Sequence, residues 1–175
     1  MFPKTYTVQP GDDATTLLTA MVDQTKKELE SLGVDKSDWE DTLIKASLIE
    51  REAKHAPDRP KMARAIENRL DRDMILQIDA SVAYGLGKPG TELTRADLRD
   101  PENPYNLYEH IGLPPTPIAN PGASSVEAVV NPADGDWIFW VAVNLKTGET
   151  KFSETNAQHE VYKQELEAWM KENGY

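Results

Sequence analysis

The sequence of 175 residues contains no cysteine. This absence excludes disulfide bonds, thiolate metal ligands and a cysteine nucleophile. Long apolar runs are absent as well, since no stretch approaches the ~18 residues of a membrane-spanning helix, and the first residues do not form a signal-peptide pattern. We therefore expect no membrane span in this chain.

Positive charge is scarce. The chain has 19 lysines and arginines against 30 aspartates and glutamates, which gives a formal net charge of −11. An acidic surface repels phosphate groups, so neither nucleic acid nor anionic lipid is expected as a partner. The hydrophobic content of 39% is ordinary for a globular protein, and the length suits one domain with a core.

Several motifs that would supply chemistry are missing. His55, His110 and His159 do not have the spacing of a zinc site, and no G-x-S-x-G elbow is present. Residues 85–90 match G-x-G-x-x-G, but no buried strand precedes them and Pro89 would disrupt the start of a phosphate-binding helix. We interpret that segment as a turn and expect neither a metal nor a cofactor.

Hydrophobic periodicity and turn formers predict an α+β fold that is mostly helical, with one small antiparallel hairpin. The hydrophobic side of the last helix should face inward through Val161, Leu166, Trp169 and Met170. The predicted elements are a short strand over 2–8, helices over 14–32, 43–56, 61–70 and 80–84, strands over 137–143 and 150–152, and a final helix that begins at Glu154 or Thr155.

Two glutamates occur late in the predicted 43–56 helix. At about 100° per residue, Ser47, Arg51 and Lys54 form a solvated stripe, and Glu50 lies at its edge. Glu52 projects on the opposite side, toward the apolar face. The two acids are therefore expected to have different environments.

The predicted surroundings of Glu52 suit a general acid. Its neighbours on the helix are Leu48 and Ile49, so its carboxylate would be poorly solvated. Poor solvation raises the pKa of a carboxyl group, which then holds a proton near neutral pH. The alternative is that Glu52 forms an ion pair with Lys45, His55 or a distant arginine.

Between residues 74 and 122, turn formers accumulate and polar and aromatic side chains become frequent. Amides and carboxylates can bind sugar hydroxyls, and flat aromatic rings can cover the apolar faces of sugar rings. Each residue also has a structural alternative: Asn106 and Asn120 as turn caps, Tyr84 in the core, and Asp79 as a helix N-cap. The set comprises Gln77, Asp79, Tyr84, Tyr105, Asn106, Tyr108 and Asn120.

Six motifs follow one another in a characteristic order. They are ASLIEREA at 46–53, NRL at 68–70, LQIDASVAYGLG at 76–87, PYNLY at 104–108, GLPPTPIANPG at 112–122 and NPA at 131–133. With these motifs the chain resembles the endolytic murein transglycosylases of the YceG-like type, from about residue 2 to the last helix. It departs from the usual family pattern at Ala80, where a proline is usual, and at Thr116, where a glycine is usual.

The resemblance implies a catalytic domain with a lysozyme-like cleft over residues 39–175. Residues 1–38 would be an N-terminal lead-in, the remnant of a LysM-like region, without the membrane anchor of the relatives. The catalytic role falls on Glu52, with Glu50 as second choice. The proposed substrate-binding residues are Gln77, Asp79, Tyr84, Tyr105, Asn106 and Asn120.

The implied activity is that of a lyase. It cleaves the β-1,4 bond between N-acetylmuramic acid and N-acetylglucosamine in nascent peptidoglycan, leaves a 1,6-anhydromuramoyl end and terminates glycan elongation. The implied location is the extracytoplasmic face of the cytoplasmic membrane, with cell-wall synthases as partners. Two alternatives stay open: a muramidase in which Asp79 serves as base or nucleophile, and a non-catalytic glycan-binding scaffold.

Overall fold

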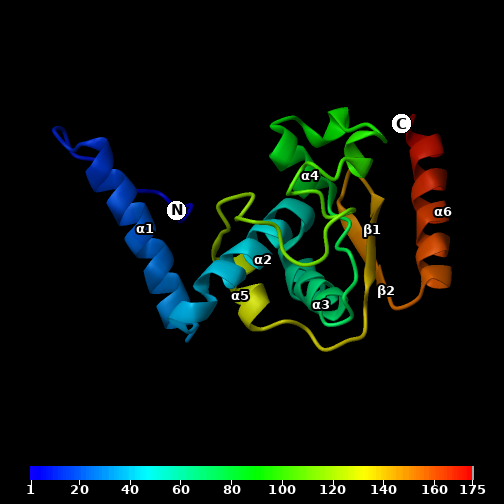
Figure 1. The fold of residues 1–175 in the computed structure, drawn as a ribbon, viewed down its shortest axis with the longest axis horizontal. Coiled ribbons are helices and arrows are strands. Elements are labelled where there is room, and N and C mark those ends of the chain that lie inside the picture. The colour runs from blue at the N-terminus through cyan, green and yellow to red at the C-terminus, as the bar shows by residue number, and fades with distance from the viewer. Residues whose placement is uncertain (175) are drawn as a thin grey trace.

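The computed structural model describes residues 1–174, and it consists of helices with a hairpin and a final helix along one side (Figure 1). The predicted α+β class is confirmed. The helices are α1 (Ala14–Ser31), α2 (Trp39–Glu52), α3 (Arg59–Leu70), α4 (Asp79–Leu86), α5 (Ala123–Val130) and α6 (Asn156–Asn173), and the strands are β1 (Phe139–Asn144) and β2 (Glu149–Ser153).

The core lies between α2, α3 and α5, which pack against one another. Leu48 and Ile49 of α2 and Met62 and Ile66 of α3 are fully buried. Met62 and Ile66 are four residues apart, so they share one face of their helix. Because α2 is packed on several sides, its C-terminal end is held at a fixed place in the fold.

The hairpin lies between α3 and α6. Its register pairs Phe139 with Ser153 and Trp140 with Phe152, and an irregularity follows between Ala142 and Asn144. The hairpin prediction is confirmed, and so is the start of the last helix, whose N-cap is Thr155.

The inward face predicted for α6 needs one correction. Leu166, Trp169 and Met170 are half-buried, but Val161 is 55% exposed. The helix lies along only one side of the hairpin, so its apolar stripe is narrower than the sequence pattern suggested (Figure 1).

The N-terminal segment lies apart from the hairpin, on the far side of the molecule (Figure 1). The strand predicted over residues 2–8 is not formed, because no second strand lies beside it. Instead, Phe2 is buried and its N–H donates to the Met21 carbonyl of α1 at 3.1 Å. At the other end of α1, Leu29 packs with Ala46 and Val126. The division of the chain at residue 38 remains a prediction.

Helix α2 ends at Glu52, four residues earlier than predicted. Ala53 and His55 have extended backbones, and Pro57 follows. Proline lacks an N–H and its ring clashes with the carbonyl four residues before it, here that of Ala53, so an α-helix cannot continue through Pro57. Helix α5 was not predicted.

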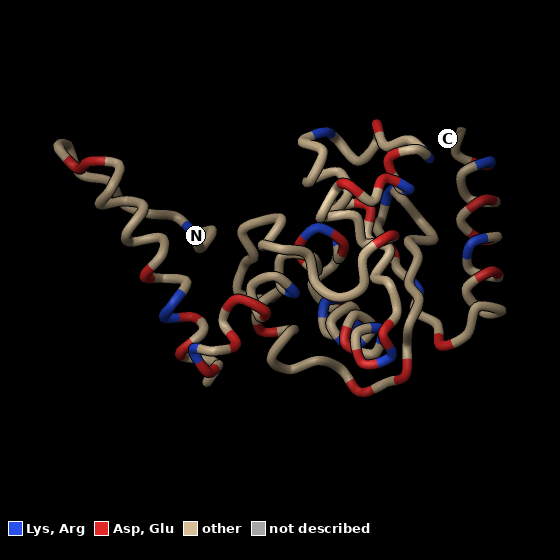
Figure 2. Tube along the Cα trace, viewed as in Figure 1, with Lys and Arg blue, Asp and Glu red and all other residues tan. Residues whose placement is uncertain are grey.

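None of the helices within residues 1–174 combines the length and apolar character needed to cross a bilayer. Acidic and basic positions are scattered over the molecule, so the net charge of −11 is not gathered in one place (Figure 2).

Candidate active site

Glu52 is the last residue of α2, and its side chain points toward the hairpin. The Trp140 indole Nε1 of β1 donates to Glu52 Oε2 at 3.4 Å. Burial raises the pKa of Glu52 and the nearby Asp79 carboxylate adds to this rise, while the Trp140 bond and the Arg51 charge oppose it. The net shift is upward, so the fold favours the protonated acid.

The alternative of an ion pair is not realised for Glu52 in the described part of the chain. Lys45 lies 3.9 Å from Glu67 instead, and the His55 side chain is exposed beyond the end of the helix. Glu52 is half-buried and its carboxyl group meets the Trp140 indole, which agrees with the prediction of a poorly solvated acid.

Asp79 is held beside Glu52 by a tyrosine. The Tyr108 hydroxyl donates to Asp79 Oδ1 at 2.5 Å. Burial and this bond raise the pKa of Tyr108, so the hydroxyl stays a donor. Asp79 does not cap α4, since the N-cap position belongs to Ile78, which makes no side-chain capping bond. The side chain of Asp79 is instead directed at the site.

Glu50 occupies a different environment on the same helix. Its Oε2 accepts hydrogen bonds from the Gly122 N–H at 3.0 Å and the Ser125 hydroxyl at 2.7 Å, and Arg59 Nη2 lies 3.4 Å from its Oε1. Burial alone would raise the pKa of Glu50, but these two bonds and the Arg59 charge outweigh it and lower the pKa. Glu50 is therefore an ionised anchor for the start of α5.

Ser47 does not belong to a solvated stripe as predicted, because its side chain is fully buried. Its hydroxyl accepts from the Ile118 N–H at 2.9 Å and donates to the Ile44 carbonyl at 2.7 Å. Ser47 and Glu50 thus fix the proline-rich loop over residues 117–122 to one face of α2. The opposite face is left to carry Glu52.

Gln77 lies at a strained backbone position next to these acids. Its φ of +54° is left-handed, which is uncommon for a residue other than glycine and is often found at functional sites. Its N–H donates to the Leu107 carbonyl at 2.9 Å, and its Oε1 accepts from Arg69 Nη1 at 3.4 Å. The strained backbone thus holds the amide beside a buried guanidinium.

A cavity of about 240 Å³ lies beside Trp140, the residue that donates to Glu52. We call it the Arg69 cavity, and it is lined by Arg69, Gln77, Tyr108, Trp140 and His159. Tyr108 and Trp140 connect it with Asp79 and Glu52, respectively, through the hydrogen bonds described above. Each acid is thus one hydrogen bond away from a side chain that lines the cavity.

Tyr84 is 48% exposed, so the alternative that it belongs to the core does not hold. Its ring meets that of Tyr105 edge-on, with centroids 5.0 Å apart, and the Tyr105 hydroxyl lies 2.8 Å from Thr116 Oγ1. Tyr84 and Ile118 line both of two further hollows. An exposed aromatic face is thus available beside the site.

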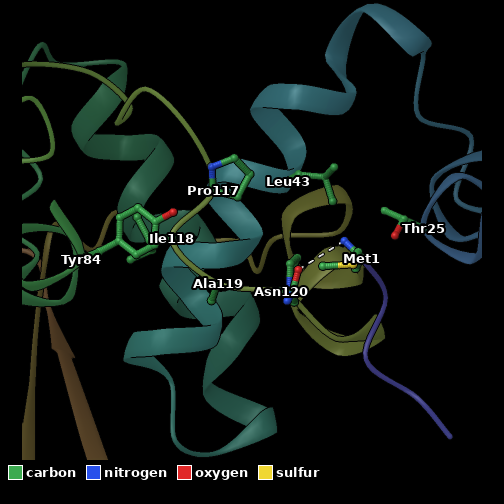
Figure 3. Close-up of a pocket in the computed structure, with 9 residues that line it drawn as sticks. Met1, Thr25, Leu43, Tyr84, Pro117, Ile118, Ala119 and Asn120 are labelled. Atoms are coloured by element: carbon green, nitrogen blue, oxygen red, sulfur yellow. Dashed lines mark hydrogen bonds between the residues drawn. The ribbon is translucent and has the colours of Figure 1, made fainter. Parts of the chain in front are cut away.

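One of the two hollows reaches α1 and the other lies along α4. One, of about 330 Å³, is lined by Asn120 together with Met1 and Pro117 (Figure 3). The other, of about 460 Å³, is lined by Arg51 and by residues 87–90. Arg51 and Tyr84 thus meet at the second hollow, between the end of α2 and α4.

The two predicted asparagines differ in access. Asn120 is exposed, and its Oδ1 accepts from the Met1 amino group at 3.3 Å (Figure 3). Asn106 is fully buried. Its Nδ2 donates to the carbonyls of Asp97 and Asp100, and its Oδ1 accepts from the Tyr108 N–H. The prediction that Asn106 binds substrate is therefore corrected: the side chain braces the loop that carries Tyr108.

Three residues of this site were not predicted: Arg69, Trp140 and His159. Arg69 could have been found, because it lies four residues after Ala65 on the apolar face of α3, where a cation is unusual. Trp140 could not have been found in this way, because in the sequence it is one of several apolar residues of a predicted strand. Within residues 1–174, no group of three or more histidines, aspartates or glutamates is placed to hold a metal ion.

Several known proteins are similar to this chain in sequence. A sequence model of the YceG-like family matches residues 1–165. An endolytic murein transglycosylase of Bacillus subtilis is 37% identical over 164 residues, which cover 91% of this chain and 45% of that protein. An endolytic murein transglycosylase of Streptococcus pneumoniae is 27% identical over 168 residues, covering 91% of this chain and 30% of that protein.

The fold also has a solved counterpart. The crystal structure of a YceG-like protein from Listeria monocytogenes superimposes with a TM-score of 0.76 at 37% identity, covering 90% of this chain and 52% of that one. The chain thus spans about half, or less, of the length of the relatives it matches.

Proposed function

The chain belongs to the YceG-like family, and from this premise we propose that it is an endolytic lytic transglycosylase of peptidoglycan. Two relatives that share most of this sequence are named endolytic murein transglycosylases. The observation that carries the proposal is the contrast between the two acids of α2. Glu52 has a raised pKa beside a polar cavity, whereas Glu50 has a lowered pKa and its hydrogen bonds anchor a loop.

In the first half of the reaction, protonated Glu52 acts as the general acid. It donates its proton to the glycosidic oxygen between muramic acid and glucosamine, and the bond from that oxygen to the anomeric carbon breaks. The glucosamine leaves with a 4-hydroxyl group. Positive charge develops on the muramic acid ring, and the carboxylate of Asp79 would stabilise it.

In the second half, the Glu52 carboxylate acts as the base. It accepts the proton of the muramic acid 6-hydroxyl while that oxygen bonds to the anomeric carbon, which closes the 1,6-anhydro ring and restores the acid. One carboxyl group is enough, because the intramolecular hydroxyl replaces the water or nucleophile that a second carboxylate serves in hydrolases.

Substrate binding is assigned to side chains that the structure leaves accessible. Gln77 and Asn120 would orient hydroxyl or acetamido groups, and the Tyr84 ring, supported by Tyr105, would cover an apolar sugar face. The hollows beside Tyr84 suit an extended strand more than an isolated sugar, which supports endolytic cleavage.

The cellular role proposed here follows from the substrate. Nascent glycan strands are assembled at the extracytoplasmic face of the cytoplasmic membrane, so the enzyme would act there, terminate glycan elongation and work beside cell-wall synthases. Residues 39–175 would form the catalytic domain and residues 1–38 a lead-in to it.

The test is product analysis of purified peptidoglycan incubated with the chain in ¹⁸O-labelled water. A lyase gives a muramoyl end one water lighter than the hydrolysis product, with no ¹⁸O at its anomeric carbon. A reducing end that carries ¹⁸O would indicate a muramidase, in which Asp79 directs water. Binding of glycan with no cleavage would instead support the scaffold alternative.

A further inference from the structure

The Arg69 cavity contains a cation whose charge no acid neutralises directly. Arg69 is only 5% exposed, yet it forms no ion pair within residues 1–174. Its Nε donates to the Ile138 carbonyl at 2.5 Å, and its Nη1 donates to the carbonyls of Ile75 and Leu76 at 3.1 and 2.7 Å. Neutral carbonyls satisfy these donors without cancelling the charge.

The guanidinium is held rigidly and remains charged. It lies over the Trp140 ring, 4.9 Å from the centroid, and 5.5 Å from the centroid of Phe139. Burial lowers the pKa of Arg69 to about 10, which leaves the side chain protonated at neutral pH. A fixed, charged fork of this kind suits a planar ligand with two oxygens.

Unused hydrogen-bonding groups converge on the same cavity. Arg69 Nη2 makes no hydrogen bond in the described chain, and Gln77 Oε1 accepts from Arg69, which leaves the Gln77 amide N–H groups free to donate. The buried Nδ1 of His159 also has no hydrogen-bond partner among residues 1–174. The cavity therefore offers mainly donors around one positive charge.

The nearest acids do not fill this role. Asp79 does not line the cavity and accepts from the Tyr108 hydroxyl, and Glu52 accepts from Trp140 and has a raised pKa. A buried cation without an internal counter-ion is costly unless a ligand supplies one.

We infer that the Arg69 cavity is a carboxylate-binding subsite, in which Arg69 and Gln77 receive a carboxylate carried by the muramic acid unit at the cleavage site. The inference rests on the proposed function, because it takes peptidoglycan as the ligand. Trp140 lines the cavity and donates to Glu52, so this one side chain connects a group held there with the carboxyl group that transfers the proton.

Two parts of peptidoglycan carry such a carboxylate. In strands without peptide the lactyl group of muramic acid is free, and in peptide-bearing strands the carboxylates belong to the stem. Binding of the disaccharide N-acetylglucosaminyl-N-acetylmuramic acid separates these sources. The disaccharide lacks the scissile bond, so the enzyme does not consume it. Its affinity is measured in four forms: with a free lactyl group, with an amidated lactyl group, with a dipeptide stem, and with that stem amidated.

We expect the unmodified chain to bind at least one carboxylate form about tenfold more tightly than its amidated counterpart, by calorimetry or NMR titration. Preference for the free lactyl form assigns the subsite to peptide-free strands, and preference for the dipeptide form assigns it to the stem. Equal affinities for both matched pairs would overturn the inference.

The variant Gln77→Glu tests the role of the cavity residues in the protein. Gln77 is exposed, so the fold should be kept, while the new carboxylate would neutralise Arg69 and abolish the tenfold preference. Gln164→Glu is the matched control, since it makes the same change in charge at an exposed position of α6 that lines no cavity described above. The inference would be overturned if Gln77→Glu still prefers the carboxylate form to its amidated counterpart, or if Gln77→Glu and Gln164→Glu lose this preference equally.

Arg69→Lys tests the cation itself. Lysine keeps the charge but loses the planar fork, so the preference should fall while thermal melting reports any loss of fold. If Arg69→Lys does not fold, the Gln77→Glu result still decides. These measurements need no cleavage, so a failed subsite is distinguishable from a failed activity, which appears only in the product analysis.

Discussion

Glu50→Gln should destabilise the fold, although Glu50 lies only two residues from the proposed catalytic acid. The carboxylate joins three segments through Gly122, Ser125 and Arg59. Glutamine keeps one oxygen that can accept the first two hydrogen bonds. It loses the negative charge, and its amide nitrogen, a donor, then faces the Arg59 guanidinium.

The magnitude follows from these contacts. A hydrogen bond to a charged group contributes roughly 1.5–3 kcal/mol and a neutral one about 1 kcal/mol, so removing the charge from two bonds costs on the order of 2 kcal/mol. The Arg59 pair adds little, because the two side chains keep 16% and 29% of their exposure and water screens them. At about 2–4 °C per kcal/mol, the melting temperature should fall by about 4–8 °C.

The pH dependence of this loss has a defined sign. The folded pKa of Glu50 is below the usual value of 4.5, so its stabilisation is present above pH 4.5 and is lost as the pH falls through the folded pKa. The gap between the unmodified chain and Glu50→Gln should therefore be full at neutral pH and close in acid.

Glu52→Gln should have the opposite effect on stability. The folded pKa of Glu52 is raised, so its protonated form is most favourable below pH 4.5, and stability is lost as the pH rises through the folded pKa. Glutamine removes that loss, so this variant should melt at or above the temperature of the unmodified chain at neutral pH. Circular dichroism melts from pH 4 to pH 8 measure both variants. A destabilised Glu52→Gln beside a neutral Glu50→Gln would refute this assignment of the two environments.

Three further outcomes are expected. Asn120→Ala should lower turnover by roughly ten- to hundred-fold, or ~1.4–2.7 kcal/mol, with little change in melting temperature; a lower melting temperature with normal turnover in the cold would remove Asn120 from the site. Cleavage should be insensitive to EDTA, since no group of metal-binding side chains lies within residues 1–174 and the mechanism uses no metal. Cleavage that is lost in EDTA and restored by zinc or magnesium would contradict this. The cleavage rate should fall as the pH rises through the folded pKa of Glu52, whereas a rate that climbs steadily with pH would indicate a different acid.

The sequence predicted correctly those features of the site that depend on the geometry of a single helix. The angle between Glu50 and Glu52 on α2 follows from helical geometry, and it separates the two environments even though the helix ends at Glu52. Ser47 shows the limit of that argument. Its burial depends on the Ile118 N–H, 71 residues away, and no periodicity within α2 reveals such a partner.

The same limit applies to the site. Trp140 reaches Glu52 across 88 residues and Tyr108 reaches Asp79 across 29, so neither contact could be predicted without the fold. Asparagine is a residue type typical of surface loops, but Asn106 is buried because loop carbonyls in the interior need hydrogen-bond donors. Arg69 is different, since its place on an apolar helix face already indicated a buried cation.

The central claim is that Glu52 transfers the proton in both halves of the reaction. The most direct measurement compares peptidoglycan cleavage by Glu52→Gln and Glu50→Gln, at a temperature where circular dichroism shows both folded. The account predicts that Glu52→Gln loses on the order of 100- to 10,000-fold in rate or more, while folded Glu50→Gln keeps forming anhydromuramoyl ends. Near-normal cleavage by Glu52→Gln together with an inactive, folded Glu50→Gln would contradict it.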